Sequence, residues 1–381
     1  MHTNTTNQTA LNVAKANNLR FLLWDGQLVK LIRDKATQTA VSDRIKQILQ
    51  RFPVSTYPAR AGLCLRDEPH TTHFPTLGYA KGVLQGLDSK QLPWVNLYGY
   101  TTDPNLTGVS NYEEYLRLYL DQVKPPFLSF DHYPLVSDTS ITARHFENWA
   151  LIRKYSLQAS IPSWGFIQSV DFKWTDNRYL PRRRPNEAEL FWQVNVSLAY
   201  GAKGLQYFTY WTPKGDASVT FGEALVTTGG KLTPLYTYAQ NVNKNYLRVV
   251  GKVLLPLTSE SVVHAGEGSS LPLGTTAFSP DGYVESTSGS PVILGRFRQP
   301  GGGTERYLFV VNRSFTNAIN PDPPQPPTQL TLDASVSGVS ELDISTETFA
   351  PVTLQKDTQG RYILEPRVAP GGARLYLLKK P

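Results

Sequence analysis

Apolar residues recur along the first two thirds of the chain with two alternating periods. Short apolar runs typical of buried strands are separated by longer stretches whose apolar residues return every three or four positions, as on one face of a helix. We expect strands at residues 19–24, 61–65, 94–100, 127–130, 161–168 and 205–211. We expect helices to include residues 41–49, 79–87, 112–123, 146–153, 186–201 and a last stretch that begins at 233. Strands that alternate with helices in this way pair in parallel, with the helices as crossovers.

This alternation predicts an α/β fold, a TIM-type (β/α) barrel over residues 1–257. Six strand–helix units are recognisable, whereas a complete barrel has eight over about 250 residues. The barrel is therefore shortened at its start, incomplete, or completed by a partner chain. An open barrel exposes two sheet edges, which pair readily with other strands. A homo-oligomer that covers these edges is one expectation.

The composition and the apolar pattern of the chain change after residue 257. Gly, Ser, Thr and Pro become frequent, and short runs of alternating apolar and polar residues are separated by turn signals. These runs lie at residues 292–297, 307–311, 329–332 and 374–378. The pattern predicts an antiparallel β-sandwich, which we assign to an accessory domain over residues 258–381.

The composition limits which kinds of fold and functional site the chain can have. Hydrophobic residues make up 40% of the 381 residues and charged residues 18%, which allows a large core and argues against extensive disorder. The single cysteine, Cys64, excludes an internal disulfide and a cysteine-rich metal site. His70 and His73 lack a recognisable third ligand, so we read them as rim residues. We expect neither a metal nor a cofactor.

The net charge is +7, and the one evident cluster of positive charge is the three consecutive arginines at 182–184. No broad basic face with interleaved aromatic residues is evident, so nucleic acid is not an expected partner. No apolar run approaches the roughly 18 residues of a membrane span. Residues 1–18 lack the apolar core of a signal peptide, so the localisation stays open between the cytoplasm and export of a domain whose leader was removed.

One strand ends in an acidic turn that stands out as a candidate for catalysis. The apolar run 61–65 is followed by Arg66, Asp67, Glu68 and Pro69. Proline cannot continue a regular ladder, so Glu68 lies where a buried strand meets a loop. Catalytic groups of α/β barrels occupy such positions, and a sheltered carboxyl there could have a raised pKa and act as a general acid. The alternative is a solvated acidic turn.

Several segments together resemble the (β/α)8 glycoside hydrolases of the large retaining clan, which include β-galactosidase-like and related bacterial members. Asp67, Glu68 and Pro69 resemble the Asn-Glu-Pro signature that ends barrel strand four and carries the acid/base. Residues 201–211 are similar to the eighth strand, whose terminal Trp, here Trp211, lines the subsite of the cleaved sugar. Residues 230–236 resemble the entry to the last helix, and residues 369–376 resemble the closing strand of an accessory sandwich. The resemblance implies a carbohydrate substrate and Glu68 as general acid.

The chain departs from this pattern at two places. Counting strands back from Trp211 puts Gln168 where the family has a nucleophilic Glu, and an amide cannot form the glycosyl-enzyme ester. The same count ends strand three at Asp25, so strands one and two are not found. Asp131, at another strand end, is the best second carboxylate. As a base that activates water it would imply inversion, and its alternative is a structural or sugar-binding role.

Other polar and aromatic residues at strand ends could bind the sugar. Sugars stack their C–H faces on aromatic rings, and their hydroxyls need polar partners. The candidates are Asp25, Asn96, Tyr98, His132, Tyr133, Trp164, Gln168 and Trp211. Any single aromatic residue among them is more often part of a core. The arginines at 182–184 could recognise an acidic sugar, or they could be solvated.

The sequence thus predicts a glycoside hydrolase that cleaves an oligo- or polysaccharide by carboxylate acid/base catalysis. Two alternatives remain open. Gln168 and the missing strands are also compatible with a catalytically degenerate barrel that binds glycans. A polysaccharide lyase is the other alternative, and it would need a base near an anionic site.

Overall fold

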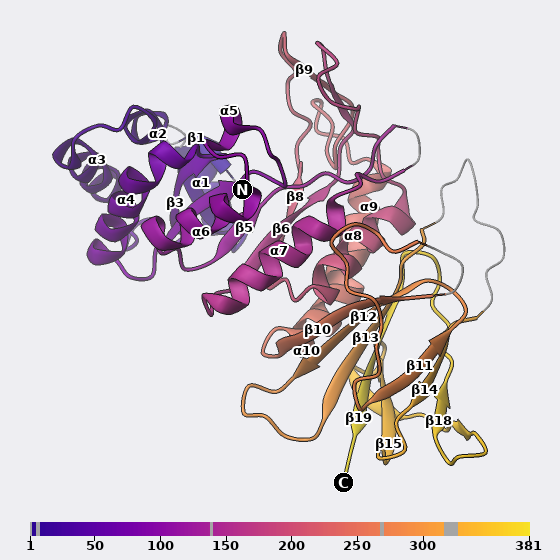
Figure 1. The fold of residues 1–381 in the computed structure, drawn as a ribbon. Helices are drawn as coiled ribbons and strands as arrows, with labels where there is room; N and C mark the ends of the chain where they lie inside the picture. The colour runs from indigo at the N-terminus through magenta and orange to yellow at the C-terminus, as the bar shows by residue number, and fades with distance from the viewer. Residues whose placement is uncertain (1, 5–7, 138–139, 267–269, 316–326) are drawn as a thin grey trace. The chain divides into compact units, whose positions relative to one another are not determined.

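The computed structural model describes residues 2–4, 8–137, 140–266, 270–315 and 327–381 of the chain. The chain forms two compact units (Figure 1). Unit 1 comprises Met1–Asp131 and Lys154–Trp164, and unit 2 comprises His132–Arg153 and Gly165–Pro381. A domain boundary at residue 257 stays a prediction.

Unit 1 is built on parallel strands that pair in chain order. They are β1 (His2–Asn4), β2 (Phe21–Trp24), β3 (Arg60–Asp67), β4 (Leu92–Leu97) and β5 (Leu128–Phe130). The order of the sheet continues with β6 (Ser163–Gln168) and β8 (Gly204–Phe208). It does not return to β1, so within the described residues the sheet remains open.

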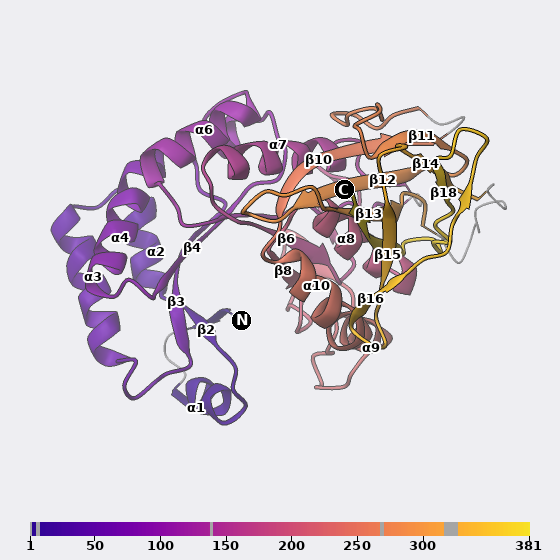
Figure 2. The same cartoon turned by 90° about the horizontal axis from the view of Figure 1, so that it is seen from below.

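The helices of unit 1 cover one face of this sheet. They are α1 (Gln8–Ala16), α2 (Gly26–Arg33), α3 (Gln38–Arg51), α4 (Phe74–Leu87), α5 (Pro104–Thr107) and α6 (Tyr112–Val123). Figure 2 shows α2, α3, α4 and α6 on the outer side of the curled strands β2, β3 and β4. The predicted stripe of α3 is buried, with Val41, Ile45 and Ile48 at most 2% exposed. Helix α3 packs on α2 and α4, and burial of such a stripe is what stabilises a helix of this length.

The helices of unit 2 begin with α7 (His145–Gln158), which continues into unit 1, and α8 (Glu187–Ala199). Asn186 and Glu189 form the predicted capping box at the start of α8. Helix α9 (Pro234–Asn241) leads through a π-helical turn, η2 (Val242–Leu247), into α10 (Arg248–Leu254). A two-stranded ribbon, β7 (Phe172–Trp174) with β9 (Val219–Phe221), carries an aromatic cluster.

Two antiparallel sheets form the rest of unit 2. The larger has the order β10-β12-β13-β19-β15-β16, and the smaller has the order β11-β14-β18-β17. Their strands are β10 (Thr258–Ala265), β11 (Val284–Ser288), β12 (Val292–Arg298), β13 (Arg306–Asn312), β14 (Gln329–Leu332), β15 (Gly338–Asp343), β16 (Thr348–Pro351), β17 (Gln355–Lys356), β18 (Tyr362–Leu364) and β19 (Ala373–Lys379). Leu294 and Val310 of the larger sheet share a buried cluster with Leu330 and Leu364 of the smaller one.

The structure agrees with the predicted strands and adds elements that the sequence did not reveal. Each of the six predicted runs overlaps a strand of the parallel sheet, although the last strand ends at Phe208, before Trp211. Strand β1 is a seventh member of the sheet, and α1 occupies part of the polar N-terminal segment. The fold is therefore a curled parallel α/β sheet together with antiparallel sheets, and the described residues do not close a barrel.

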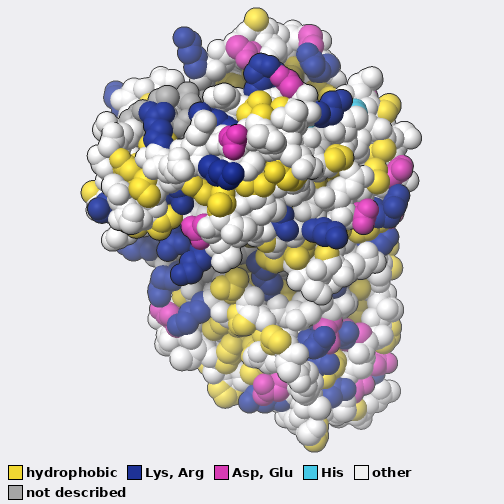
Figure 3. All heavy atoms as spheres, turned by 90° about the vertical axis from the view of Figure 1, so that its left-hand side faces the viewer, with side chains coloured by type: hydrophobic (Ala, Val, Ile, Leu, Met, Phe, Trp, Pro, Cys, Tyr) yellow, Lys and Arg dark blue, Asp and Glu magenta, His cyan; other side chains and the backbone are white. Residues whose placement is uncertain are grey.

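None of the helices in the described part of the chain has both the length and the apolar character needed to cross a bilayer. On the face drawn in Figure 3, Lys and Arg side chains are dispersed and mixed with Asp and Glu.

Candidate active site

Glu68 and Asp131 flank the end of the same strand. Glu68 follows β3 and donates its backbone N–H to the carbonyl of Asn96 in β4, at 2.8 Å. Asp131 follows β5 and donates its backbone N–H to the carbonyl of Leu97, the next residue of β4, at 3.3 Å. Because β4 lies between β3 and β5, these bonds anchor the two acids on either side of its carboxyl end. Both acids belong to unit 1.

The backbone of Glu68 has an unusual conformation. Its φ is 45°, in the left-handed region that residues other than glycine seldom adopt. The following residue is held in place because Tyr115 donates its hydroxyl to the carbonyl of Pro69, at 2.6 Å. Backbone strain of this kind clusters at functional sites. The predicted interruption of the strand before Pro69 is therefore a bend of the backbone at Glu68.

A second layer of polar side chains supports the acids. Asn96 is 1% exposed and donates its side-chain N–H to Asp67, at 3.2 Å. Ser129 donates its hydroxyl to the side-chain oxygen of Asn96, at 3.0 Å. This relay runs across β3, β4 and β5. It gives Asn96 a supporting role beneath the acids, since almost none of its surface is left for a ligand.

The environment of Glu68 favours its neutral form. Its pKa is raised to about 9, chiefly by burial and then by the negative charges of Asp131 and Asp67, against the opposing charge of Arg66. A carboxyl with this pKa carries a proton at neutral pH. Glu68 is only half-buried, so a ligand can reach it. The residue combines access with a transferable proton, as a general acid requires.

Tyr98 lies in the same electrostatic environment. Its pKa is raised to about 12, first by burial and next by the charge of Glu68. Its carbonyl accepts a hydrogen bond from the Tyr112 hydroxyl, at 2.7 Å, and its ring stays half-exposed. A neutral phenol beside the acid can stack on a sugar ring and donate to a hydroxyl. Tyr98 therefore remains a candidate for substrate binding.

Arg66 is a residue that the sequence prediction did not place in the site. It precedes Glu68 by two positions, its charge acts on Glu68 and Tyr98, and its Nε is buried without a hydrogen-bond partner in the described part of the chain. Together with burial, Arg66 also lowers the pKa of His73 to about 4. The imidazole of His73 accepts the backbone N–H of His70, at 3.1 Å, so these histidines order the turn after the acids.

Asp25 has a structural role that replaces its predicted role in sugar binding. It is 3% exposed and caps α2 by accepting the N–H of Leu28, at 2.7 Å. Both of its oxygens also pair with Arg44, at 2.6 and 3.0 Å. A carboxylate occupied in this way does not contact a ligand.

The same correction applies to Gln168 and His132 of unit 2. Gln168 is fully buried; its side chain accepts the N–H of Leu135, at 3.0 Å, and donates to the carbonyls of Leu135 and Arg183. The two ring nitrogens of His132 are bonded to Asn148 and Thr142. These side chains hold loops together, so we no longer assign them to substrate.

The remaining aromatic candidates differ in accessibility. Trp164 stacks on Phe127 with ring centroids 4.4 Å apart. In unit 2, Tyr133 packs against Phe208, with centroids 4.9 Å apart. Trp211, also in unit 2, lies beyond the end of β8 and is 51% exposed. Of these three rings, Trp211 offers the most surface to a ligand.

The arginine run at 182–184 is largely engaged within unit 2. Arg183 pairs with Glu189, which is fully buried, at 2.6 Å. Arg182 lies over the ring of Trp174. Only Arg184 has a distant and exposed partner, Glu223 at 3.9 Å. Recognition of an acidic sugar by the whole run is not supported by these contacts.

No family model matches the chain, and no curated protein matches it. Among solved structures, it is similar to a β-galactosidase from the psychrophilic Marinomonas ef1, with 10% identity and a TM-score of 0.45 over 65% of this chain and 54% of the other. An endo-β-1,4-mannanase from Thermotoga petrophila has 12% identity and a TM-score of 0.39, over 78% and 77%. A family 30 subfamily 8 xylanase from Clostridium acetobutylicum has 9% identity and a TM-score of 0.39, over 97% and 82%.

These solved structures are glycoside hydrolases. The chain spans about half the length of the β-galactosidase, 54% of it. Similarity at this level assigns neither a family nor an activity to the chain.

Proposed function

We propose that this protein is a glycoside hydrolase that acts on an oligo- or polysaccharide, with Glu68 as general acid and Asp131 as its carboxylate partner. The observation that carries the proposal is the pair of acids at the end of β4, one of which has a pKa of about 9. Glycoside hydrolysis requires two carboxyl groups in opposite protonation states. A neutral Glu68 beside the charge of Asp131 meets that requirement.

The reaction follows from these two states. Glu68 donates its proton to the glycosidic oxygen as the bond to the anomeric carbon breaks. Asp131 removes a proton from a water molecule, whose oxygen forms the new bond to that carbon. The proton gained by Asp131 and the proton lost by Glu68 balance over one turnover. In this arrangement the configuration at the anomeric carbon is inverted.

The neighbouring residues have supporting roles in this proposal. Tyr98 contributes an aromatic face and a neutral hydroxyl beside Glu68. Trp211, an exposed ring of unit 2, stays a separate prediction. Asp67 keeps negative charge near Glu68 and so favours its protonated state. Arg66 opposes this effect and limits the shift.

Replacement of Glu68 by glutamine tests the proposal. Glu68→Gln preserves size but removes the proton, so we expect hydrolysis of a responsive glycan to fall by about 10²–10⁴-fold. The matched control is Glu114→Gln, which changes an exposed acid in the first turn of α6, also in unit 1. Products would be followed by NMR, which also reports the anomer first released. Turnover of Glu68→Gln within a few fold of the parent protein would contradict the assignment.

Folding is monitored in the same experiment by thermal unfolding. Burial of a carboxyl whose pKa is raised costs stability above the ordinary pKa of Glu, so the glutamine variant is expected to unfold at an equal or higher temperature. A loss of activity together with a lower melting temperature would indicate misfolding, and Glu68→Asp would then be used to shift the carboxyl without removing it.

A second candidate function is glycan binding without hydrolysis. It is favoured by Gln168, which occupies the position of the nucleophile in the glycoside hydrolases that the sequence resembles. This amide is fully buried and hydrogen-bonded to Leu135 and Arg183. Calorimetric binding of an oligosaccharide, with no product after long incubation of the parent protein, would support this function over hydrolysis.

A further inference from the structure

One edge of unit 1 contains the turns that lead from each helix into the next strand. Strands β2 to β5 are parallel, so their amino ends lie along the edge opposite to the two acids. The register pairs Phe21 with Arg60 and Gly62 with Leu92, which puts these strand starts at one level. Helices α3, α4 and α6 pack side by side before β3, β4 and β5 (Figure 2). We call the last turns of α1, α3, α4 and α6, with the connections 17–20, 52–59, 88–91 and 124–127, the amino edge.

Five cations of the amino edge are exposed and have no acid partner. Within the described part of the chain, none of their side chains forms an ion pair or a hydrogen bond, although Arg51 lies over the ring of Phe52. They are separated along the sequence, and the parallel topology of unit 1 brings them to one edge. The five residues are Lys15, Arg20, Arg51, Lys90 and Lys124.

Acids compensate only part of this charge. Arg60, at the start of β3, is buried and pairs with Asp88 of the amino edge, at 3.8 Å. Asp121, exposed in the last turn of α6, is the other acid of these segments. With Arg60 included, six cations against two acids leave the amino edge with a net charge of +4. This charge selects an anionic partner.

Exposed apolar side chains lie among these cations. Leu19 is 49% exposed, Val54 is 38% exposed and Leu87 is 50% exposed. Each lies within three residues of an exposed cation, in the connections before β2 and β3 and at the end of α4. Single exposed apolar residues are common on protein surfaces. Here the same combination of an apolar side chain and a cation recurs at three successive connections of one edge.

The helix dipole accounts for some of the cations and for none of the apolar residues. Lys15 and Arg51 lie in the last turns of α1 and α3, and Lys124 follows α6 directly, where a cation stabilises a helix. Arg20 and Lys90 lie beyond their helices, where this effect has faded. Cations mixed with exposed apolar side chains instead match a partner that is anionic at its surface and apolar beneath it.

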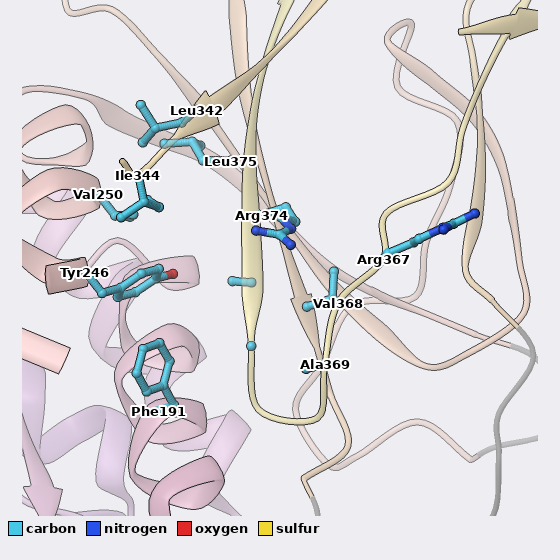
Figure 4. Close-up of a pocket in the computed structure, with 12 residues that line it drawn as sticks. Phe191, Tyr246, Val250, Leu342, Ile344, Arg367, Val368, Ala369, Arg374 and Leu375 are labelled. Atoms are coloured by element: carbon cyan, nitrogen blue, oxygen red, sulfur yellow. The ribbon is translucent and has the colours of Figure 1, made fainter. Parts of the chain in front are cut away.

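The hollow of unit 2 drawn in Figure 4 lacks this combination. Its side chains Val250 and Leu342 are 2% and 4% exposed, and Figure 4 shows them together with Ile344 at one end of the hollow. Arg374 is already paired with Glu341, at 3.4 Å. The apolar residues there are largely part of a core, whereas those of the amino edge face the solvent.

We propose that the amino edge binds the surface of a membrane that contains anionic lipids, with its cations on lipid phosphates and Leu19, Val54 and Leu87 between the headgroups. The negative potential of such a surface attracts cations, and the apolar side chains gain by leaving water. The acids at the carboxyl ends of β3 and β5 belong to the opposite edge of unit 1, so a bound membrane leaves them accessible. The interaction does not depend on Glu68 or on hydrolysis.

The test is co-sedimentation of the full-length protein with two kinds of vesicle, pure phosphatidylcholine and phosphatidylcholine with about one third phosphatidylserine. We expect binding only to the second kind, weakening as the salt concentration rises from about 0.05 to 0.5 M. Arg20→Glu combined with Lys90→Glu should weaken binding at least about tenfold. The matched control is Lys35→Glu combined with Lys214→Glu, which reverses two exposed cations outside the amino edge and should leave binding within about twofold.

A second pair of substitutions tests the apolar contribution. Leu19→Ser combined with Leu87→Ser keeps every charge, and we expect it to weaken vesicle binding by about 3- to 30-fold. Heparin, a soluble polyanion without an apolar layer, is the comparison probe. Any binding of heparin should be unaffected by the serine substitutions.

Three results would overturn the proposal: no binding to the phosphatidylserine vesicles, equal weakening by the two charge-reversed pairs, or vesicle binding unchanged by the serine pair. The last result together with tight binding of heparin would identify a soluble polyanion as the partner. Thermal unfolding reports whether each variant is folded, and Arg20→Gln with Lys90→Gln replaces the glutamate pair if that pair does not fold. Failure of the proposed hydrolase is a separate result, because Glu68→Gln should bind the vesicles as the parent protein does.

Discussion

Glu68 differs from the other acids of the chain in three respects that reinforce one another. Its backbone is left-handed, its amide is fixed to β4, and its half-buried carboxyl has a pKa raised by burial and by the charges of two further acids. The first two place the side chain, and the third sets its protonation state. The proposed acid role therefore rests on one residue whose geometry and electrostatics agree.

The pH dependence of hydrolysis follows from the raised pKa of Glu68. A general acid must be protonated. The titration of Glu68 should therefore leave kcat/KM unchanged near neutral pH and make it fall about tenfold per pH unit above about pH 9. The measurement is kcat/KM between pH 6 and 10.5, with circular dichroism at each pH to confirm that the protein stays folded. A decline over the whole range from pH 6 upward would mean that the catalytic acid has a pKa below 6, which contradicts the raised pKa of Glu68.

Asp67→Asn provides the internal control for this profile. The negative charge of Asp67 raises the pKa of Glu68, so its removal should shift the alkaline limb to lower pH. Asn96, which donates to Asp67, can still bond to the oxygen of an asparagine. An alkaline limb that does not move would show that another group controls it.

The position of Glu68 at the end of a strand could be predicted, because Pro69 interrupts that strand. The hydrogen-bond partners of buried polar residues could not, because they are distant in the sequence. Asp25 was misread because its partner Arg44 lies on another helix. Gln168 was misread because it bonds to Leu135, more than thirty positions earlier. No local pattern distinguishes an exposed polar strand end from one that is buried against a remote loop.

At the level of elements, the register of β3 on β4 positions the acids, and it depends on one close approach. A Cβ at Gly62 would lie 2.1 Å from the carbonyl oxygen of Leu92 and 2.6 Å from its nitrogen. We expect Gly62→Ala to destabilise the protein by about 1–3 kcal/mol, because the strands must separate. Urea unfolding followed by tryptophan fluorescence measures the change.

The matched control for this prediction is Gly82→Ala. Gly82 lies on the exposed side of α4, and a Cβ there would meet nothing within 4 Å. The same chemical change should stabilise the protein by up to about 1 kcal/mol, because alanine favours the helix. If both substitutions shifted the unfolding midpoint in the same direction, the close contact between β3 and β4 would not be limiting.

Elements with a strong apolar pattern were predictable from sequence, and polar ones were not. Helix α6 runs from Tyr112 to Val123 as expected, because a stripe of buried residues and a stop before Pro125 define it. Strand β1 was missed because three residues, His2–Asn4, carry no apolar alternation. Its place in the sheet comes from backbone pairing with β2, which leaves no trace in the side-chain pattern.

At the level of the whole molecule, the core of unit 2 contains histidines that are neutral when folded. Burial lowers the pKa of His132 to about 4 and that of His264 to about 3. His264 is 1% exposed, and its ring is hydrogen-bonded to the hydroxyl of Tyr200, at 2.9 Å. Burial also lowers the pKa of His145. These groups link the stability of unit 2 to pH.

The sign of this linkage is set by where the protons bind. Below about pH 6.5 the unfolded chain protonates these histidines while the folded protein does not, so stability is lost as the pH falls. The loss continues to about pH 4 for His132 and about pH 3 for His264, with a limiting slope of about 1.4 kcal/mol per pH unit for each. Urea midpoints measured from pH 7 to pH 4 should therefore fall steadily.

His264→Asn isolates one contribution to this fall. Asparagine can still bond to Tyr200 but does not titrate, so the slope below pH 6 should decrease by about 1.4 kcal/mol per pH unit even if stability at pH 7 is lower. The slope, and not the absolute stability, is the informative quantity, because a packing defect lowers the whole curve without tilting it. A variant curve parallel to that of the parent protein would show that His264 becomes protonated without unfolding.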